Sequence, residues 1–316
     1  MTVSVVIPAY NAAKFIDQAV ASVLAQDRPA DEIIVVDDGS TDRDYSELQR
    51  LHASIKVVRQ PNRGVSAARN VGCDVARSEY IAILDADDVW VAGKLRAQMR
   101  HLEAQPGIDA AFCEGFFWRP ASDGSGWTVP EIARSPAAST PEVTHLHYPD
   151  FLCGVPVAPS TMVVRKSAWT EINGFDERIR FGEDHDFYFR LSYRARADLL
   201  RMVGVLYRQH SNNASAILQQ QNHWAEVVIR TVKSLGTTDT MGHQVDRRRL
   251  REHLNRIRFL HGYEHFWAGN FEVARREFAQ AARLAPWEAK SVGYLMVSSI
   301  PGLRALARSS RRRASR

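Results

Sequence analysis

The chain has few cysteines and no long apolar run, and each scarcity excludes a class of protein. Its three cysteines are far apart and form no C-x-x-C pair, so neither a disulfide framework nor a zinc site is indicated. The longest late stretch without charge, residues 291–303, contains Pro301 and is shorter than the ~20 apolar residues of a membrane-spanning helix. We therefore expect reduced thiols and no transmembrane helix.

The N-terminal sequence MTVSVVIPAYN also lacks the features of a secretory signal. It has no basic start, no separate apolar stretch and no small-residue cleavage site, and leads directly into an expected strand. We therefore expect a cytoplasmic protein. The balanced composition, 45% hydrophobic and 24% charged residues, is typical of a packed globular protein.

An excess of basic residues is confined to one end of the chain. Residues 304–316 contain six arginines and no acidic residue, and without those six the remaining 35 basic residues face 36 acidic ones. A nucleic-acid-binding protein is therefore an alternative that only this tail motivates. The tail and the apolar residues before it could also contact an anionic membrane, which would place the protein at the inner face of the plasma membrane. The other interpretation of residues 291–316 is a packed final helix followed by a solvated end.

Short β-branched segments alternate with helical periodicity in the first part of the chain. Strands are expected at 3–7, 33–36, 55–58, 80–84 and 161–164, and helices at 15–24, 43–53, 65–76, 167–172 and around Phe187 and Leu191. This alternation predicts an α/β fold whose mostly parallel, Rossmann-like sheet has helices on both faces. Residues 119–147, rich in Pro, Ser, Gly, Ala and Thr, are expected to form a loop.

The second part of the chain, residues 216–316, is expected to be helical. The stretch WAGNFEVARREFAQAARLAP within it resembles half of a tetratricopeptide repeat. Stacked repeats need about three copies for independent stability, so we expect this single unit to pack on the preceding α/β domain. The predicted domains are therefore 1–215 and 216–316, the second ending in the basic tail.

Three acidic clusters follow predicted strands or lie in the loops beside them, in the segments VDDGSTD, LDADD and GEDHDF. The carboxyl ends of the strands of an open α/β sheet border a crevice, so these clusters should converge. Asp85 and Asp87 of LDADD should project to the same side of the chain. Two adjacent carboxylates suit a hard divalent ion such as Mg²⁺ or Mn²⁺, which prefers oxygen ligands and keeps positions open for phosphates. A helix cap with solvated turn acids is the alternative.

The ordered succession VSVVIPAYN, IIVVDDGSTD, NRGVSAARN, YIAILDADD, NGFDE and GEDHDF closely resembles the family 2 glycosyltransferases with the GT-A fold, over residues 1 to about 215. The resemblance implies an inverting transfer of a sugar from a nucleotide-diphosphate sugar, with UDP as the usual nucleotide. The implied acceptor is a hydroxyl of a cell-surface glycan or lipid-linked saccharide. A catalytically silent nucleotide-sugar-binding protein is the alternative. The processive synthases of the family differ, because their spanning helices and Q-x-x-R-W motif are missing here.

The resemblance assigns nucleotide-binding roles to Pro8, Ala9, Tyr10 and Asp38. A tyrosine ring can stack on a base, and a carboxylate can accept a hydrogen bond from a base or ribose. Arg69 resembles the basic residue that the family has near the nucleotide; a helix-surface arginine is its alternative.

The metal and the diphosphate are assigned in the same way. Asp87 resembles the principal metal ligand, Asp85 lies near both ribose and metal, and Ala86 between them is placed with the nucleotide contacts. In the segment YRQHSNNAS, Arg208 resembles a phosphate-binding residue and His210 an additional metal ligand. An ordinary loop histidine is the alternative for His210.

The GEDHDF segment carries the implied catalytic residues. Asp184 resembles the base that takes the proton of the acceptor hydroxyl, and Glu183 resembles a residue that orients the acceptor. An N-cap with a first-turn acid is the alternative for both. His185 departs from the aromatic or other large residue that the family often has there.

Overall fold

The computed structural model describes residues 1–119, 141–210 and 217–302. Its strands are β1 (Val3–Ala9), β2 (Glu32–Asp37), β3 (Ile55–Arg59), β4 (Tyr80–Ile83), β5 (Val89–Trp90), β6 (Ala110–Trp118), β7 (Val143–Leu146), β8 (Val163–Arg165) and β9 (Ala197–Arg208). Its helices are α1 (Ile16–Leu24), α2 (Val65–Val75), α3 (Lys94–Ala104), α4 (Tyr148–Leu152), α5 (Lys166–Glu171), α6 (Glu183–Arg194), α7 (His223–Leu235), α8 (Arg247–Ala268), α9 (Phe271–Leu284) and α10 (Ala289–Ser299). Two 3₁₀ turns are η1 (Tyr45–Arg50) and η3 (Pro159–Thr161).

The strands form one sheet in the order β3-β2-β1-β4-β8-β6-β9-β5, with β7 added beside β9. The first four strands are parallel, as the alternation of strands and helices predicts. Beyond β4 the sheet is mixed, because β8 runs antiparallel to both β4 and β6, whereas β6 and β9 are parallel. The expected α/β class is confirmed, with parallel pairing concentrated in the N-terminal half of the sheet.

Alternate side chains of the central strands build two separate cores. Val5 and Ile7 of β1 face the core that α1 and α3 cover, whereas Val6 faces the core that contains α2, α5 and α6. Adjacent residues of a strand point to opposite faces, so an uninterrupted apolar run such as VVI at 5–7 requires helices on both sides. Gly72 of α2 permits close packing there, since an added Cβ would lie 2.3 Å from the Cγ1 of Val6.

Three details differ from the sequence-based expectations. The segment expected as a helix at 43–53 contains only the 3₁₀ turn η1. Thr161 belongs to η3, so the strand expected from that residue begins at Val163. Within the segment expected to be a loop, β7 pairs with β9, and residues 120–140 lie outside the described ranges.

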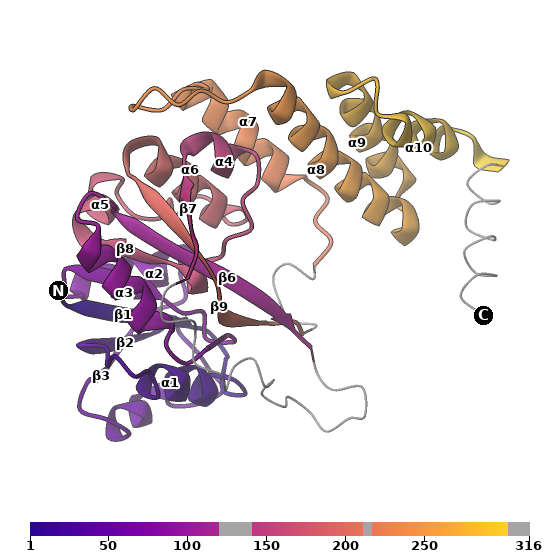
Figure 1. Cartoon of the computed structure of the whole chain (residues 1–316). Coiled ribbons are helices and arrows are strands. Elements are labelled where there is room, and N and C mark those ends of the chain that lie inside the picture. The colour runs from indigo at the N-terminus through magenta and orange to yellow at the C-terminus, as the bar shows by residue number, and fades with distance from the viewer. Residues whose placement is uncertain (120–140, 211–216, 303–316) are drawn as a thin grey trace.

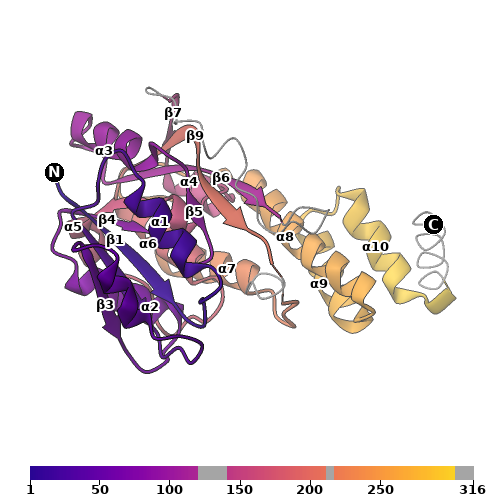
Figure 2. The ribbon, with the colours of Figure 1, turned by 90° about the horizontal axis from the view of Figure 1, so that it is seen from below.

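The last four helices continue from the core of the sheet and extend away from it (Figures 1 and 2). Leu250, Leu254 and Ile257 in the first half of α8 share a core with α4, α6 and α7. In the second half of α8, Phe266 packs with α9 and α10 in a separate cluster. The expected helical C-terminal region is therefore present, and α8 belongs to both packing units. The domain boundary expected near residue 215 lies outside the described residues, and the tetratricopeptide likeness stays a prediction.

Within the described ranges, no helix combines the length and the apolar character needed to cross a bilayer.

Candidate functional site

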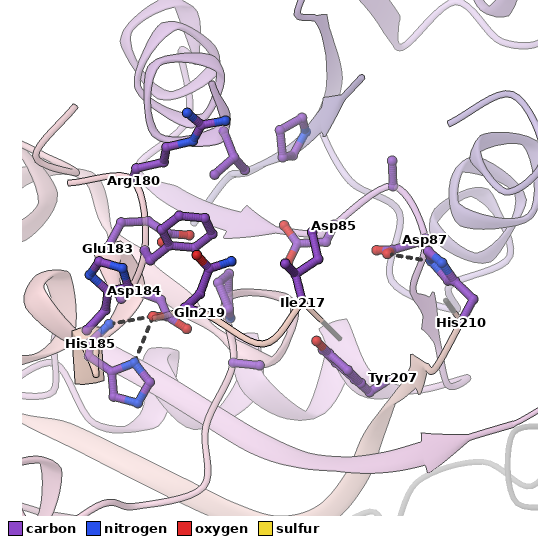
Figure 3. A pocket seen from close by; sticks show the side chains of 18 of the residues that line it. Asp85, Asp87, Arg180, Glu183, Asp184, His185, Tyr207, His210, Ile217 and Gln219 are labelled. Carbon is purple, nitrogen blue, oxygen red and sulfur yellow. Dashed lines mark hydrogen bonds and ion pairs between the residues drawn. The ribbon is translucent and has the colours of Figure 1, made fainter. Parts of the chain in front are cut away.

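A large open cavity of about 1740 Å³ lies at the carboxyl ends of β1 and β4 and extends to the C-terminal helices (Figure 3). Its walls come from the loops after these two strands, the start of α6, the end of β9 and one face of α8. Residues of LDADD and GEDHDF line it, and so do Thr41 and Asp42 of VDDGSTD, whereas Asp37 and Asp38 are not among the described residues that line it. The expected convergence therefore holds for LDADD and GEDHDF, and for VDDGSTD only at its last two residues.

The LDADD segment presents two carboxylates to the cavity and turns the last one inward. Asp85 and Asp87 line the cavity, together with Ala86 between them. Asp88 is buried, accepts hydrogen bonds from Ser160 Oγ at 2.6 Å and from the Arg208 backbone N–H at 3.1 Å, and has a pKa raised well above the usual value by burial and by the neighbouring acids. Asp88 therefore fastens the loop to η3 and β9.

Asp87 and His210 meet across the cavity rim. The His210 Nε2 lies 3.0 Å from an Asp87 carboxylate oxygen, and the His210 ring stacks on Phe15 with centroids 4.7 Å apart. Burial, and next the charge of Asp85, raise the pKa of Asp87, although the contact with His210 opposes this rise. The sequence predicted both residues as metal ligands, and the structure brings them into direct contact.

The donor set at this rim suits a divalent ion that is held only in part by protein. Two carboxylates and an imidazole, Asp85, Asp87 and His210, are available on the cavity wall. In residues 1–119, 141–210 and 217–302, no three or more Asp, Glu, His or Cys side chains are arranged to hold a metal. Mg²⁺ sites commonly use one or two carboxylates and complete the octahedron with water and substrate phosphates. The residues therefore fit an ion that arrives with a diphosphate.

Arg69 of α2 connects the two acidic segments. Its guanidinium donates to Asp85 at 2.8 Å and to Glu183 at 3.2 Å, and it lies over the ring of Phe175 at 5.0 Å. The residue is only 4% exposed, which excludes the alternative of a helix-surface arginine. Burial alone would lower the pKa of Arg69, but the two carboxylates raise it above its ordinary value. Arg69 is thus a fixed cation between both walls.

The catalytic residues implied by the sequence stand in the first turn of α6. Gly182 precedes the helix with φ +78°, a left-handed conformation that favours glycine. The Asp184 carboxylate accepts hydrogen bonds from the backbone N–H and the Nδ1 of His185, each at 2.8 Å. Burial would raise the pKa of Asp184, but His185, and to a lesser extent Arg69, lower it to about 2. Asp184 is therefore an ionised carboxylate on the cavity wall.

The pKa values of His185 and Glu183 are both raised, whereas that of Asp184 is lowered. Burial lowers the pKa of His185, but the charge of Asp184 outweighs this and raises it above 6.5. The pKa of Glu183 is raised, chiefly by burial, with the attraction of Arg69 opposing the rise. The ring of His185 also packs on Trp224 of α7, with centroids 4.9 Å apart. The residue that departs from the family pattern is thus the direct partner of Asp184.

The residues implied as nucleotide contacts divide into two groups. Pro8 and Tyr10 line the cavity, and Tyr10 is 53% exposed. Ala9, Asp38 and Arg208 are not among the described residues that line it.

Asp38 and Arg208 instead make internal contacts. Asp38 is buried and accepts hydrogen bonds from the Gln60 side chain and from the backbone N–H groups of Arg63 and Gly64, at 2.7 to 2.9 Å. Arg208 donates to the Asp87 carbonyl at 2.7 Å and lies between the rings of Phe15 and Trp118. Their direct roles at a nucleotide stay predictions.

Several residues on the cavity wall were not predicted from the sequence. Gln219 and Trp224 come from the connection to α7 and from α7 itself, and Leu260 and Glu264 come from α8. No motif marks them, because the wall they form depends on the packing of distant helices. The only signal in the sequence is the 3-4 spacing of residues on the α8 face.

Comparisons with known proteins agree with the fold and identify a family. The family model described as Glycosyl transferase family 2 matches residues 4–159. The uncharacterized glycosyltransferase EpsJ of Bacillus subtilis is 31% identical over 226 residues, which are 68% of this chain and 63% of EpsJ. Hyaluronan synthase of Pasteurella multocida is 27% identical over 246 residues, 75% of this chain and 24% of that enzyme. The chain thus spans less than two thirds of the length of either relative.

The fold is similar to that of a solved glycosyltransferase structure. The crystal structure of S. aureus TarS 1-349 in complex with UDP-GlcNAc superposes with a TM-score of 0.63, 20% identity and coverage of 94% of this chain and 90% of that one. At this identity the likeness concerns the fold, and it extends over the C-terminal helices as well as the sheet. The family match over residues 4–159, together with the 31% identity to EpsJ, shows that the chain belongs to glycosyl transferase family 2.

Proposed function

We propose that the protein is an inverting glycosyltransferase that moves a sugar from a nucleotide-diphosphate sugar, with UDP favoured, to an acceptor hydroxyl of a cell-surface glycan or lipid-linked saccharide. The observation that carries this proposal is the single cavity that Asp85, Asp87, Asp184 and His210 all line. The proposal is also supported by the names of similar proteins: hyaluronan synthase is named for a polysaccharide, and TarS was solved with UDP-GlcNAc.

The donor half of the proposed site lies around the ends of β1 and β4. Tyr10 offers an exposed ring for a base, and Asp85, Asp87 and His210 would hold Mn²⁺ or Mg²⁺. When bound, such an ion neutralises the charge of a leaving diphosphate as a Lewis acid. Arg69 keeps Asp85 fixed through its 2.8 Å contact, so the carboxylate needs little reorganisation when a donor binds.

The proposed chemical step uses the ionised carboxylate of Asp184. It accepts the proton of the acceptor hydroxyl while that oxygen attacks the anomeric carbon from the face opposite the nucleotide. The bond to the sugar forms as the bond to the diphosphate breaks, so one displacement inverts the anomeric configuration. Glu183, held by Arg69, orients the acceptor.

A screen of nucleotide-sugars tests the proposal directly. The full chain is mixed with UDP-, GDP- and dTDP-sugars, with and without Mn²⁺, and both thermal stabilisation and slow release of the nucleotide are measured. We expect stabilisation by a UDP-sugar that needs the ion, accompanied by hydrolysis. Binding without any turnover, even with saccharide acceptors present, would favour the silent binding protein instead. Absence of binding to all of them would contradict the proposal.

The proposed location is beside a membrane, at its cytoplasmic face. A lipid-linked acceptor would be presented there, and the sequence of residues 304–316 has six arginines without an acidic residue. These residues lie outside the described ranges, so the proposal rests on their charge alone. Anionic lipids attract basic segments by about 1 kcal/mol for each residue near the surface.

A further inference from the structure

The helix α8 turns one face toward the cavity at the end away from β1. Ile257, Leu260, His261 and Glu264 line it, and their spacing of three, one and three residues places them along one side of the helix. Leu260 is 48% exposed although it is a large apolar residue. Glu264 is exposed and makes no ion pair with a described residue. An exposed leucine next to an unpaired carboxylate is unexplained by packing.

The same helix anchors the chain segment around Gln219, which lines the cavity. The carbonyl of Gln219 accepts hydrogen bonds from the Nε2–H groups of His261 and His265, each at 2.8 Å. Arg276 of α9 donates to the Gln220 carbonyl at 2.9 Å. Burial lowers the pKa of His261, which keeps the ring neutral. Gln219 therefore has a fixed backbone, and its side chain lies in the cavity near Asp184 (Figure 3).

Trp224, at the start of α7, is the third part of this cavity wall. It lines the cavity and packs on His185, the partner of Asp184. Its Nε1 atom is buried and has no hydrogen-bond partner among the described residues. Buried indole N–H groups usually have a partner. Trp224 thus connects the wall formed by α8 with the carboxylate that is proposed to accept the proton.

These residues offer both apolar surface and hydrogen-bonding groups, and a sugar has both as well. Leu260 and Trp224 provide apolar area for the C–H faces of a pyranose ring, and the side chains of Gln219 and Glu264 can bond to its hydroxyls. From Ile257 to Glu264 the helix rises by about 10 Å, more than the length of one pyranose ring. The wall is therefore suited to a chain of sugars.

We propose that this face of α8, with Gln219 and Trp224, is the acceptor-binding wall of the cavity and takes an oligosaccharide of at least two sugar units. The inference rests on the proposed glycosyltransferase function, and it gives the C-terminal helices a part in choosing the acceptor. Asp184 then lies between a donor bound near β1 and β4 and an acceptor that lies along α8.

The test measures acceptor and donor binding separately in the full chain. Wild-type protein with UDP and Mn²⁺ is applied to an array of immobilised mono- and oligosaccharides, and UDP affinity is measured in solution. Leu260→Asp should weaken binding to the best oligosaccharide by tenfold or more and leave UDP affinity within twofold. Met296→Asp, the same kind of change at a residue of α10 that is 60% exposed and outside the cavity, should alter neither. Leu260→Ala serves as a milder variant, and thermal melting checks that each variant is folded.

The outcomes separate this inference from the proposed function. Unchanged oligosaccharide affinity in folded Leu260→Asp and Leu260→Ala would overturn it, as would a wild-type protein that binds UDP but no oligosaccharide on the array. Preference for the single sugars of the array over its oligosaccharides would equally count against it. A wild-type protein that binds no nucleotide or nucleotide-sugar would contradict the proposed function itself, and the acceptor wall with it.

Discussion

Arg69 compensates charge that would otherwise separate the two acidic segments of the cavity. Asp85 and Glu183 are more than ninety residues apart in sequence, and each lies within 3.2 Å of the same guanidinium. A buried arginine needs such partners, because an unpaired charge in the interior costs several kcal/mol. The two loops are therefore positioned together before any ligand binds.

The carboxylate of Asp87 is expected to be essential for metal-dependent donor binding. Asp87→Asn keeps the size of the side chain and removes the charge that a divalent ion would need. We expect Mn²⁺-dependent affinity for a UDP-sugar to be lost, as measured by titration calorimetry with and without EDTA. Glu264→Gln, an equal loss of charge on the α8 wall, should leave that affinity intact. Undiminished Mn²⁺-dependent binding by Asp87→Asn would contradict the assignment of Asp87 as a metal ligand.

Asp184→Asn should separate chemistry from binding. The amide cannot accept the proton of the acceptor hydroxyl, so transfer should fall by ~10² or more. Donor affinity should stay nearly the same, because the proposed donor contacts come from other residues, around the ends of β1 and β4. Single-turnover transfer and donor titration measure the two effects. If the folded variant transfers sugar near the wild-type rate, another residue is the base.

His185 is expected to make the transfer rate depend on pH. Its pKa is raised above 6.5, so at lower pH the ring is cationic and holds the pKa of Asp184 near 2. Glu183 also faces His185, Trp224 packs on it, and nearby His253 is neutral because burial lowers its pKa to about 4. When His185 loses its proton, Asp184 becomes more basic, and the rate should rise.

His185→Gln removes this titration, and the variant should lack the rise in the single-turnover rate that the wild type shows as pH increases through the raised pKa of His185. The ion pair also stabilises the fold below the unfolded pKa of His185, and that contribution fades as pH passes through the folded value. A superimposable pH profile for wild type and His185→Gln would contradict the coupling.

At the scale of elements, the start of α6 depends on Gly182. Its φ of +78° costs a residue with a Cβ about 1–2 kcal/mol, and that Cβ would also lie 3.2 Å from Val227 of α7. Gly182→Ala should lower the melting temperature and slow transfer more than it weakens donor binding, because Asp184 is two residues on. The matched control is Gly242→Ala, also at positive φ but with open space around it. Transfer in Gly182→Ala equal to that of the control would contradict the expectation.

The sequence predicts well those elements whose pattern of apolar residues follows directly from which of their faces are buried. Strands β1, β2 and β4 contain consecutive apolar residues, at 5–7, 33–36 and 80–83, because both of their faces are buried. Strands β6 and β9 were not predicted. The first half of β6 is buried, whereas Phe116 and Phe117 in its second half are exposed, so no single period runs through it.

The candidate site was predictable to the extent that its residues belong to short motifs. Asp85, Asp87, Asp184 and His210 line one cavity as their motifs imply. The sequence could not show that Asp38 binds the backbone of residues 63 and 64, or that Arg208 lies between two aromatic rings, because these partners are set by tertiary packing. For the same reason it gave no indication of the wall formed by α8.

At the scale of the whole molecule, α8 makes the C-terminal helices part of the same packed body as the sheet. Its first half shares the core of α6 and α7, and its second half carries α9 and α10 away from the sheet (Figure 1). Gly262 allows α9 to approach closely, since an added Cβ would lie 3.0 Å from the ring of Phe278. The helices therefore keep a fixed position relative to the cavity, whatever else they contact.

The distribution of charge leads to the last prediction, which concerns membrane association. Without the six arginines of residues 304–316 the chain is nearly neutral, so the tail should dominate attraction to anionic lipid at about 1 kcal/mol for each basic residue near the surface. We expect the full chain to float with vesicles of phosphatidylglycerol and phosphatidylcholine at low salt and to be released at high salt, because screening weakens the attraction. A chain ending at Pro301 should stay unbound at low and at high salt. Vesicles of phosphatidylcholine alone should recover neither protein. Equal flotation of both chains, or of neither, would remove the tail from the membrane contact and leave an ordinary solvated end.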